Sequence, residues 1–465
     1  MTISAVTSGS VYVGMALTGG TLSGSATIVS FGTFNGTSGT VNLSIAQTFA
    51  NPTTVTGNYS VANYPAITVK GIVYLDGTYY VMDLNGSIYG SGINNPLGWS
   101  ALNVIQSNAE PDGGVALFRQ LNLIVAFQTT STEFFYDAAN PVGSPLLPYA
   151  SAFIEVGCAS GNSVAQTENT LFFMGVTKQK GRAIYKLDGT KSKMVSNPFI
   201  DRLLNADDLS NVSAFCVRIS GHTFYVLYLG NTQQTLVFDS TSQLWGKWTV
   251  SALSATKTVS AATWLGGTAT LTITGHGFND GDLTTIAGIT PIGYNGAFTI
   301  NTIDANTITY PLATSQTNLT VSGTAANYVQ TPFNMASYTS GNNLDLVQDS
   351  TTGFVFVLDN GTYQDNGNPI EVLIRTFKFD AGNNNKKFTS QLEIIGDKVT
   401  SNAYIRYTND DYQTYSKFRP VNLGAQRSLI NRLGQTRRRA YEIRHHSNTP
   451  LRLESLETTV TEGSL

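Results

Sequence analysis

The sequence is poor in charged residues, cysteine and histidine. Asp, Glu, Lys and Arg make up 12% of its 465 residues, and it contains two cysteines and four histidines. A secreted domain held together by disulfides would have more cysteines, so we expect Cys158 and Cys216 to be buried thiols. This cysteine content is typical of a soluble protein made in a reducing cytoplasm.

Targeting and membrane-spanning segments are also missing. The first twenty residues lack the basic region and apolar core of a signal peptide. No run approaches the roughly eighteen apolar residues that a membrane-spanning helix needs, so we expect no stable membrane insertion.

Signatures of catalysis and metal binding are absent as well. No Gly-x-Ser-x-Gly elbow, phosphate-binding loop, His-Glu-x-x-His pair or Cys-x-x-Cys pair occurs. His276 stands alone between two glycines, which favours a turn residue over a metal ligand. His445 and His446 are neighbours on an expected strand, so their rings should point in opposite directions at a solvated edge. The sequence therefore predicts no enzyme activity, no catalytic residue, no metal and no cofactor.

Gly, Ser, Thr and Asn are abundant, and no window shows a 3.6-residue apolar rhythm with helix caps. This composition is typical of short strands joined by tight turns. We expect an all-β chain.

A period of about fifty residues runs through much of the sequence. Asp137, Asp188 and Asp239 each close an apolar strand-like run, at intervals of 51 residues, and Asp359 closes a fourth run. Repeats of this length that carry several short strands are the signature of a β-propeller. Five blades are recognisable and we expect six. Trp99 and Trp248 occupy one repeat position, where we expect them to pack between blades.

The repeat divides the chain into five expected segments. They are an N-terminal β region at 1–65 (a separate layer or part of a blade), propeller blades at 66–250, an inserted small β-barrel at 251–328, a further blade at 329–370, and a C-terminal β-sandwich-like domain at 371–465. The insertion resembles the small β-barrel module of ubiquitin-activating enzymes, which also occurs in phage structural proteins. Its elements Gly275-His276-Gly277-Phe278 and Gly293-Tyr294-Asn295-Gly296-Ala297-Phe298 carry that resemblance.

Charge is distributed unevenly along the chain. Residues 1–370 contain 12 basic and 20 acidic residues, whereas residues 371–465 contain 15 basic and 10 acidic residues. A protein that wraps DNA tightly would be basic overall, so we do not expect tight wrapping.

The strongest charge feature is a set of six arginines near the C-terminus: Arg427, Arg432, Arg437, Arg438, Arg439 and Arg444. On a strand, Arg437 and Arg439 would share one face and Arg438 would point the other way. One interpretation is a solvated strand whose charges protect a sheet edge. The other is contact with an acidic partner surface or with DNA phosphates. Both stay open, and these six residues are the candidate contacts.

Residues 408–415, Thr-Asn-Asp-Asp-Tyr-Gln-Thr-Tyr, resemble a degenerate Asp-box, the hairpin turn of sialidases and other propellers. The Asp of such a turn bonds local backbone amides, which is a structural role. The expected blades contain too few arginines for the sialidase site, so we do not expect a glycosidase.

Several stretches together resemble the tail hub, or nozzle, protein of short-tailed bacteriophages, the packaged-DNA stabilisation family. One is the step Ser107-Asn108-Ala109-Glu110-Pro111-Asp112, followed by an apolar strand and by Thr132-Glu133-Phe134-Phe135. The other is Arg432-Leu433-Gly434-Gln435-Thr436-Arg437-Arg438-Arg439-Ala440-Tyr441-Glu442-Ile443-Arg444. The resemblance spans about residues 65–250 and 330–465, and residues 1–60 depart from the family pattern.

This resemblance implies a virion tail protein assembled in the host cytoplasm. It implies a homo-oligomer, a hexameric ring below the portal and adaptor proteins, which retains packaged DNA, forms the DNA ejection channel and carries tail fibres or spikes. A mildly acidic body would let DNA slide through the channel. The alternative function is a host-surface carbohydrate-binding propeller, an adhesin of the virion. It would need exposed Trp or Tyr platforms at the blade ends.

Overall fold

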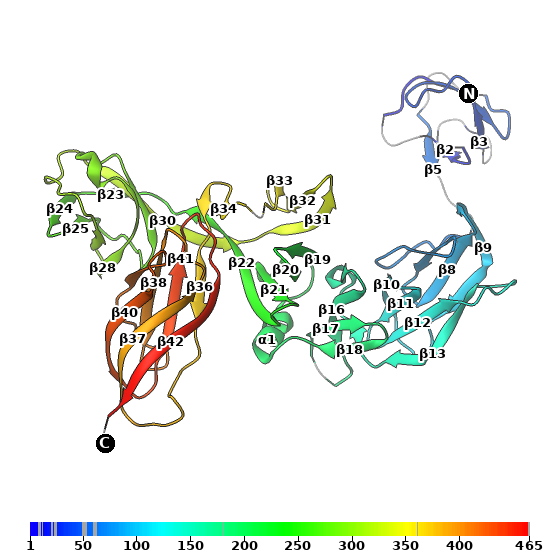
Figure 1. The fold of residues 1–465 in the computed structure, drawn as a ribbon. Coiled ribbons are helices and arrows are strands. Elements are labelled where there is room, and N and C mark those ends of the chain that lie inside the picture. The colour runs from blue at the N-terminus through cyan, green and yellow to red at the C-terminus, as the bar shows by residue number, and fades with distance from the viewer. Residues whose placement is uncertain are drawn as a thin grey trace. The chain divides into compact units, whose positions relative to one another are not determined.

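The computed structural model describes residues 1–7, 11, 13–19, 22, 26–48, 54–58, 63–179, 181–359 and 361–463. Part of the expected N-terminal β region lies outside these residues. The regular structure described is almost entirely β-strand, so the all-β prediction is confirmed (Figure 1). No helix in the described ranges has the length and apolar character to cross a membrane.

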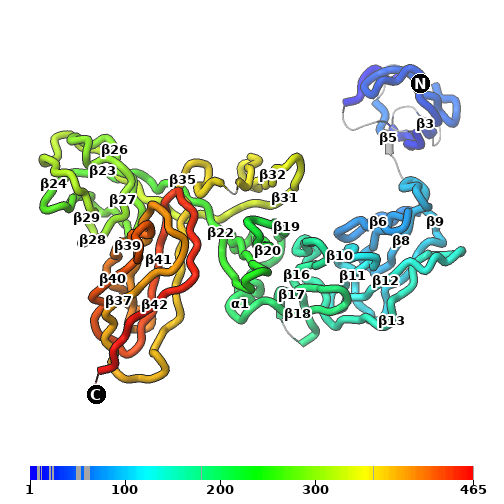
Figure 2. The backbone as a smooth tube through the Cα atoms, viewed as in Figure 1, coloured from blue at the N-terminus to red at the C-terminus, as the bar shows by residue number. Residues whose placement is uncertain are grey.

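The chain forms two compact units. Unit 1 contains residues 1–217 and 229–232, and unit 2 contains residues 218–228 and 233–465. Figure 2 traces the backbone from blue at the N-terminus to red at the C-terminus. These units do not test the five expected segments, whose boundaries stay a prediction.

Unit 1 begins with a five-stranded sheet in the order β1-β4-β3-β2-β5. Its strands are β1 (Thr2–Ile3), β2 (Ala16–Thr18), β3 (Ala26–Phe31), β4 (Gly39–Leu43) and β5 (Thr56–Asn58). A small core of Met15, Leu17, Ile28 and Val41 stabilises this sheet.

Three antiparallel sheets follow in unit 1. The first sheet contains β6 (Val73–Leu75), β7 (Thr78–Met82), β8 (Ser87–Gly92) and β9 (Asn95–Gln106). The second, which we call the middle sheet, contains β10 (Gly114–Gln120), β11 (Leu123–Gln128), β12 (Thr132–Asp137) and β13 (Leu146–Ile154). The third contains β14 (Gly157–Cys158), β15 (Ala165–Thr167), β16 (Thr170–Val176), β17 (Ala183–Asp188) and β18 (Lys191–Met194). The hairpin between β6 and β7 turns at Asp76 and Gly77, both with positive φ, and Asp-Gly is a dipeptide typical of such tight turns.

The middle sheet is buried on both faces. On β11, Ile124 and Ala126 belong to a core shared with the first sheet. Val125 and Phe127 belong to a core shared with the third sheet. Successive residues of a strand point to opposite faces, so the uninterrupted apolar run of β11 serves both cores. This stacking of sheets is the arrangement that the repeat predicted.

Two of the recurring aspartates, Asp137 and Asp239, close their strands by local hydrogen bonding. β12 and β17 end at Asp137 and Asp188, and β21 (Gln234–Asp239) ends at Asp239. Asp137 Oδ1 accepts from the amide of Ala139 over 2.7 Å, and Asp239 Oδ1 accepts from the amide of Thr241 over 2.9 Å. An aspartate that bonds the amide two residues on turns the chain, which explains its recurrence at strand ends.

The sequence analysis did not predict helix α1. α1 (Pro198–Ala206) begins after Asn197, whose Oδ1 accepts from the amides of Phe199 and Ile200, each over 3.0 Å. Asparagine at the N-cap with proline at the first helical position is a recognised helix start. The helix has nine residues, too few for a clear apolar period.

β19 (Val212–Ile219) and β20 (His222–Leu229) lie where the chain passes between the units, and β21 and β22 (Leu244–Leu253) continue unit 2. β22 then pairs antiparallel with β30 (Gly323–Pro332), from Thr249 opposite Pro332 to Leu253 opposite Tyr328. The chain therefore leaves along one strand and returns along its hydrogen-bonded neighbour.

Two sheets lie between these strands in sequence. One is β24 (Ala261–Leu265), β25 (Thr268–Thr272), β29 (Thr307–Pro311) and β28 (Asn301–Asp304); the other joins β23 (Lys257–Val259), β26 (Leu283–Ala287) and β27 (Gly296–Thr299) to β30. Both sheets contribute to one core, which includes Ala262, Leu271, Ile286, Ile308 and Ala325. We call residues 257–328 the inserted segment; its assignment as the expected barrel stays a prediction.

Unit 2 continues with a three-stranded sheet and a short hairpin. The sheet is β31 (Met335–Gly341), β32 (Leu344–Asp349) and β33 (Val355–Val357), and the hairpin is β34 (Gln364–Asp365) and β35 (Asn368–Pro369).

The C-terminal part is a sandwich of two antiparallel sheets. One has the order β36 (Val372–Arg375), β41 (Ala440–His445), β38 (Asn402–Thr408) and β39 (Arg419–Asn422); the other has the order β40 (Ser428–Thr436), β37 (Lys387–Gly396) and β42 (Leu453–Glu462). The core between the two sheets includes Leu392, Ile405, Ile430 and Ile443. Figure 1 shows these strands in orange and red.

Candidate functional site

The C-terminal sandwich carries all six candidate arginines, but in different environments. Arg437 and Arg438 lie in the bend between β40 and β41, not on a strand as expected. Arg432 lies on β40 with a φ of 61°, next to an irregularity in the pairing with β37. The expected alternation of faces along Arg437–Arg439 is therefore wrong, because the chain turns there.

Four of the six are on the surface. Arg427 forms an ion pair with Glu393, and Arg438 pairs with Asp411 over 2.6 Å. Arg437 donates to the carbonyl of Asn384 over 3.3 Å. Arg432 is exposed and has no ion-pair partner within the described part of the chain. Exposed pairs of this kind contribute little to stability, so these guanidinium groups can exchange partners.

Arg439 is buried, with 3% of its surface exposed. Its Nε donates to Asn409 Oδ1 over 2.9 Å, and its guanidinium carbon lies 4.1 Å from the ring centroid of Tyr407. Nη1 and Nη2 are buried without a hydrogen-bond partner among the described residues. Another molecule could reach Arg439 only after the bend between β40 and β41 had moved.

Arg444 belongs to a buried charge cluster centred on Glu442, whose side chain is fully buried. Glu442 on β41 lies opposite Arg375 on β36 and opposite Arg406 on β38. Its Oε2 accepts from Arg375 Nε over 2.7 Å, and its Oε1 accepts from Arg406 Nε over 2.9 Å. Arg444 Nε lies 3.4 Å from Glu442 Oε1. Buried charges persist only when they are paired in this way.

The cluster extends to the inserted segment. Arg444 lies 3.5 Å from Asp282 and 3.6 Å from Glu371. Lys417 Nζ donates to Asp280 Oδ2 over 2.9 Å. Burial alone would raise the pKa of Asp280, but hydrogen bonds from Lys417 and Thr302 outweigh it and lower that pKa. Arg444 thus has a structural role here, and its part in any partner contact stays a prediction.

The turn that resembles an Asp-box has the expected structural role. Asp410 Oδ1 accepts from the Thr414 amide over 2.9 Å and from the Thr408 hydroxyl over 2.8 Å. These hydrogen bonds lower the pKa of Asp410 to about 2. The turn positions Tyr415, whose ring lies 4.0 Å from the guanidinium carbon of Arg406.

The two adjacent histidines are buried, so the expectation of a solvated edge is wrong. His445 Nε2 lies 3.2 Å from Ser401 Oγ, and His446 Nε2 lies 3.0 Å from Thr299 Oγ1. Strand β41 lies between β36 and β38 in its sheet, and Thr299 of the inserted segment contacts His446. Sequence reasoning missed this because Thr299 and His446 are 147 residues apart.

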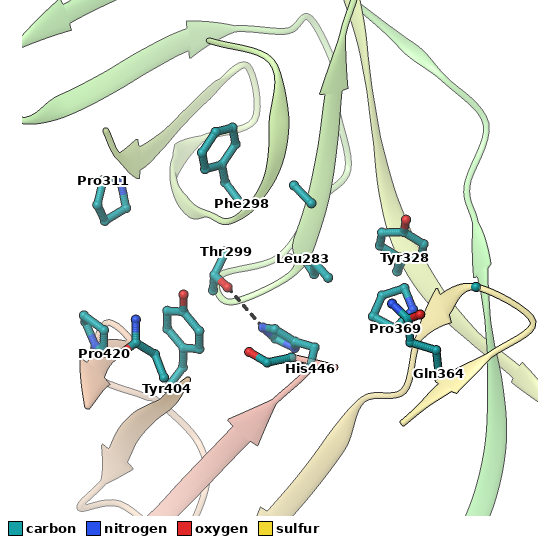
Figure 3. A pocket seen from close by; sticks show the side chains of 14 residues that line it. Leu283, Phe298, Thr299, Pro311, Tyr328, Gln364, Pro369, Tyr404, Pro420 and His446 are labelled. Carbon is teal, nitrogen blue, oxygen red and sulfur yellow. Dashed lines mark hydrogen bonds between the residues drawn. The ribbon is translucent and has the colours of Figure 1, made fainter. Parts of the chain in front are cut away.

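A pocket of about 520 Å³ lies beside His446 in unit 2. Figure 3 shows the hydrogen bond between Thr299 and His446, with Phe298 and Tyr404 on one side and Tyr328 on the other. The lining comes from the inserted segment, from the β34–β35 hairpin and from the C-terminal sandwich. No local motif identified this pocket, because it forms only when these segments come together.

The other residues singled out from the sequence are His276 and the two cysteines. His276 is a buried turn residue, with Gly275 and Gly277 at positive φ on either side. Cys158 is buried and Cys216 is partly exposed; desolvation raises the pKa of both thiols to about 12. No group of three or more His, Cys, Asp or Glu side chains that could hold a metal occurs in the described ranges.

The stacked antiparallel sheets and the 51-residue repeat define an all-β protein of the propeller class. The family described as "Bacteriophage P22 Gp10, beta-propeller" matches residues 12–271, more than half of the chain. The chain belongs to this family, and it is therefore a structural protein of a bacteriophage. The family predicted from sequence is confirmed, whereas the number of blades stays a prediction.

Other comparisons add little. No curated protein matches the sequence. Two matching solved structures are the computationally designed Ika8 protein and BamB from Moraxella catarrhalis. Each is 11% identical to this chain with a TM-score of 0.26, and the alignments cover 62% of this chain and 70% and 84% of theirs. Similarity at this level carries no functional argument.

Proposed function

We propose that this chain is a tail hub, or nozzle, protein that forms a ring below the portal and adaptor of a short-tailed phage. In this role it retains the packaged DNA and forms the channel through which the DNA leaves. The observation that carries the proposal is the family match over residues 12–271, together with the stacked sheets of unit 1.

The charge distribution supports the ring. The first 370 residues are net acidic and the remainder is net basic. A ring closed by rotation uses two different surfaces of each copy, and opposite charges favour such a head-to-tail contact. The exposed Arg427, Arg432, Arg437 and Arg438 are the candidate contacts to the next copy, to the adaptor or to DNA. An acidic body weakens DNA binding along a channel, which suits passage of the genome.

The experiment is cryo-electron microscopy of virions that encode this chain, with units 1 and 2 fitted separately. We expect six copies around the tail axis, directly below the portal and adaptor, with fibres or spikes attached. Density only in peripheral fibres, or none in the particle, would overturn the proposal and favour the adhesin alternative.

DNA retention needs its own measurement. Particles assembled without this chain should package their genome and then lose it, measured as nuclease-protected DNA per head. Restoration of the chain from a plasmid is the control. Full retention without the chain would limit its role to attachment or ejection.

A further inference from the structure

None of the described residues that line the pocket beside His446 carries a charged side chain. The residues that line it are Leu283, Ala297, Phe298, Thr299, Pro311, Tyr328, Gln364, Gly367, Pro369, Asn402, Tyr404, Pro420, His446 and Ser447. Its floor is buried at Thr299, Pro369 and His446, while Ala297, Pro311, Gly367, Asn402 and Pro420 are exposed around it. Its volume of about 520 Å³ lies in the range of roughly 300–1,000 Å³ that is usual for small-molecule sites.

Several polar groups in the lining have no partner of their own. The side chains of Gln364, Asn402, Tyr404 and Ser447 make no hydrogen bond with any other described residue. Together they offer two amides and two hydroxyls, each of which can donate and accept. A set of free groups around one cavity is suited to a ligand that carries several hydroxyl or amide groups.

The floor of the pocket is neutral and fixed. Burial, with smaller contributions from Arg444 and His445, lowers the pKa of His446 to about 4, so the imidazole is uncharged at neutral pH. Its Nε2 is held by Thr299, and its ring stacks on Tyr404 with centroids 5.5 Å apart. The charged groups nearest in sequence face elsewhere: Arg444 faces Glu442, Glu371 and Asp282.

Aromatic faces complete the lining. Phe298, Tyr404 and Tyr328 come from three different strands, β27, β38 and β30 (Figure 3). Phe298 is itself supported by Tyr310, with the two rings stacked 4.2 Å apart. Flat aromatic faces bind flat apolar surfaces, such as the C–H faces of a sugar ring.

We propose that this pocket binds a neutral saccharide. A charged ligand would enter a cavity with no opposite charge to compensate its desolvation. A purely hydrocarbon ligand would cover the free amides and hydroxyls without bonding them, which is unfavourable. A neutral sugar satisfies both conditions, because its hydroxyls pair with the amides and hydroxyls while its C–H faces pack on the rings.

The test uses the purified full-length chain. Saturation-transfer NMR and calorimetry are run with glucose, galactose, mannose and N-acetylglucosamine, with their neutral disaccharides, and with the neutral polysaccharides dextran and mannan. The charged probes are sialyllactose and glucose 6-phosphate. We expect a neutral sugar to bind and the charged probes not to bind. Preference for a mono- or disaccharide would indicate a free sugar, and preference for a polysaccharide would indicate a cell-surface polymer.

Matched variants locate the binding. The double variant Asn402→Ala with Tyr404→Phe removes one amide and one hydroxyl and keeps the aromatic face, so it should weaken binding about tenfold or more. The control double variant Asn431→Ala with Tyr74→Phe makes the same chemical changes at exposed positions outside the pocket and should leave binding unchanged. Circular dichroism and the unfolding midpoint should be normal for both.

Three results would overturn the proposal. They are no binding of any neutral sugar, equal binding of the charged probes, and equal affinity of the pocket variant and the wild-type chain. Since binding is measured on the isolated chain, the outcome does not depend on where the protein lies in the virion.

Discussion

Glu442 lies directly opposite Arg406 in the C-terminal sandwich, and its Oε1 accepts from Arg406 Nε over 2.9 Å. On its other side the same carboxylate accepts from Arg375 Nε over 2.7 Å. One buried anion thus lies between two guanidinium groups, with Arg444 as a third close by. This carboxylate is central to the packing of β36, β41 and β38, and through Arg444 the cluster extends to Asp282 of the inserted segment.

Replacement of Glu442 should be strongly destabilising. Glu442→Gln leaves the mostly buried Arg406 without its anion, whereas Arg444 keeps Asp282 and Glu371. We expect the free energy of unfolding to fall by about 3–5 kcal/mol. Urea unfolding measures this. The matched control is Glu393→Gln, which removes the partner of the exposed Arg427 and should change the free energy of unfolding little. Equal losses in the two variants would contradict the role of the cluster.

Charge reversal in the β40–β41 bend should impair assembly but not folding. Arg437→Glu and Arg438→Glu change exposed side chains, so the chain should fold normally. The yield of infectious particles should fall at least about tenfold, because a glutamate that faces an acidic partner surface disfavours association. Arg439 is unsuitable for this test because it is buried.

The ion pair of Arg438 supplies the control for that test. Asp411→Asn removes the anion that pairs with Arg438 and Lys378, and it leaves both arginines of the bend in place. A normal particle yield with Asp411→Asn, beside a loss with the charge reversals, indicates contact with a partner. An equal loss with Asp411→Asn would show that only the internal pair mattered, and the assembly interpretation would then be abandoned.

Asp365 should make the protein less stable as the pH rises. Burial raises the pKa of Asp365 to about 6, above its ordinary value of 3.8. The folded state therefore holds the proton more tightly than the unfolded state, and this contribution to stability is lost as the pH increases from about 4 through 6. Asp365→Asn should raise the free energy of unfolding at pH 8 by about 1 kcal/mol, after allowance for solvent screening, and leave it unchanged at pH 3.5. If Asp365→Asn changed the thermal midpoint equally at pH 3.5 and at pH 8, the raised pKa of Asp365 would be refuted.

Trp99 separates the tail hub from the adhesin alternative. It is 8% exposed, its Nε1 donates to the Pro96 carbonyl over 2.8 Å, and it meets Tyr64 edge to face at 4.9 Å. Trp99→Ala should therefore lower the free energy of unfolding by about 3 kcal/mol. The control Leu97→Ala, at an exposed position of the same strand, should have little effect. A stable Trp99→Ala protein that had lost glycan binding would instead support the adhesin.

Local patterns predicted much of the fold. The apolar run of β11 and the Asp-Gly turn before β7 carry their structural information in a few adjacent residues, so strand and hairpin were both readable. Asp137 and Asp239, at the ends of β12 and β21, each bond the amide two residues on, and such a short-range role makes the repeat visible in the sequence. Helix α1 was missed because its start signal, Asn197-Pro198, precedes only nine helical residues.

The candidate site was harder to predict because its contacts are distant in sequence. Nothing near Arg444 in the sequence indicates Asp282, and nothing near His446 indicates Thr299. Glu442 could have been noticed, since an acid within an arginine-rich strand suggests a shared ion-pair network. The burial of Arg439 depends on Tyr407 and Asn409 of another strand and turn, and needed the structure.

The pairing of β22 with β30 has an evolutionary consequence. Because the two ends of the inserted segment are hydrogen-bonded neighbours, a short turn between Leu253 and Tyr328 could replace the whole segment without redirecting either strand. A segment joined in this way can be gained, lost or exchanged between related phages while the sheets on either side keep their order. The same junction is a natural position for grafting a reporter or an affinity module onto the protein.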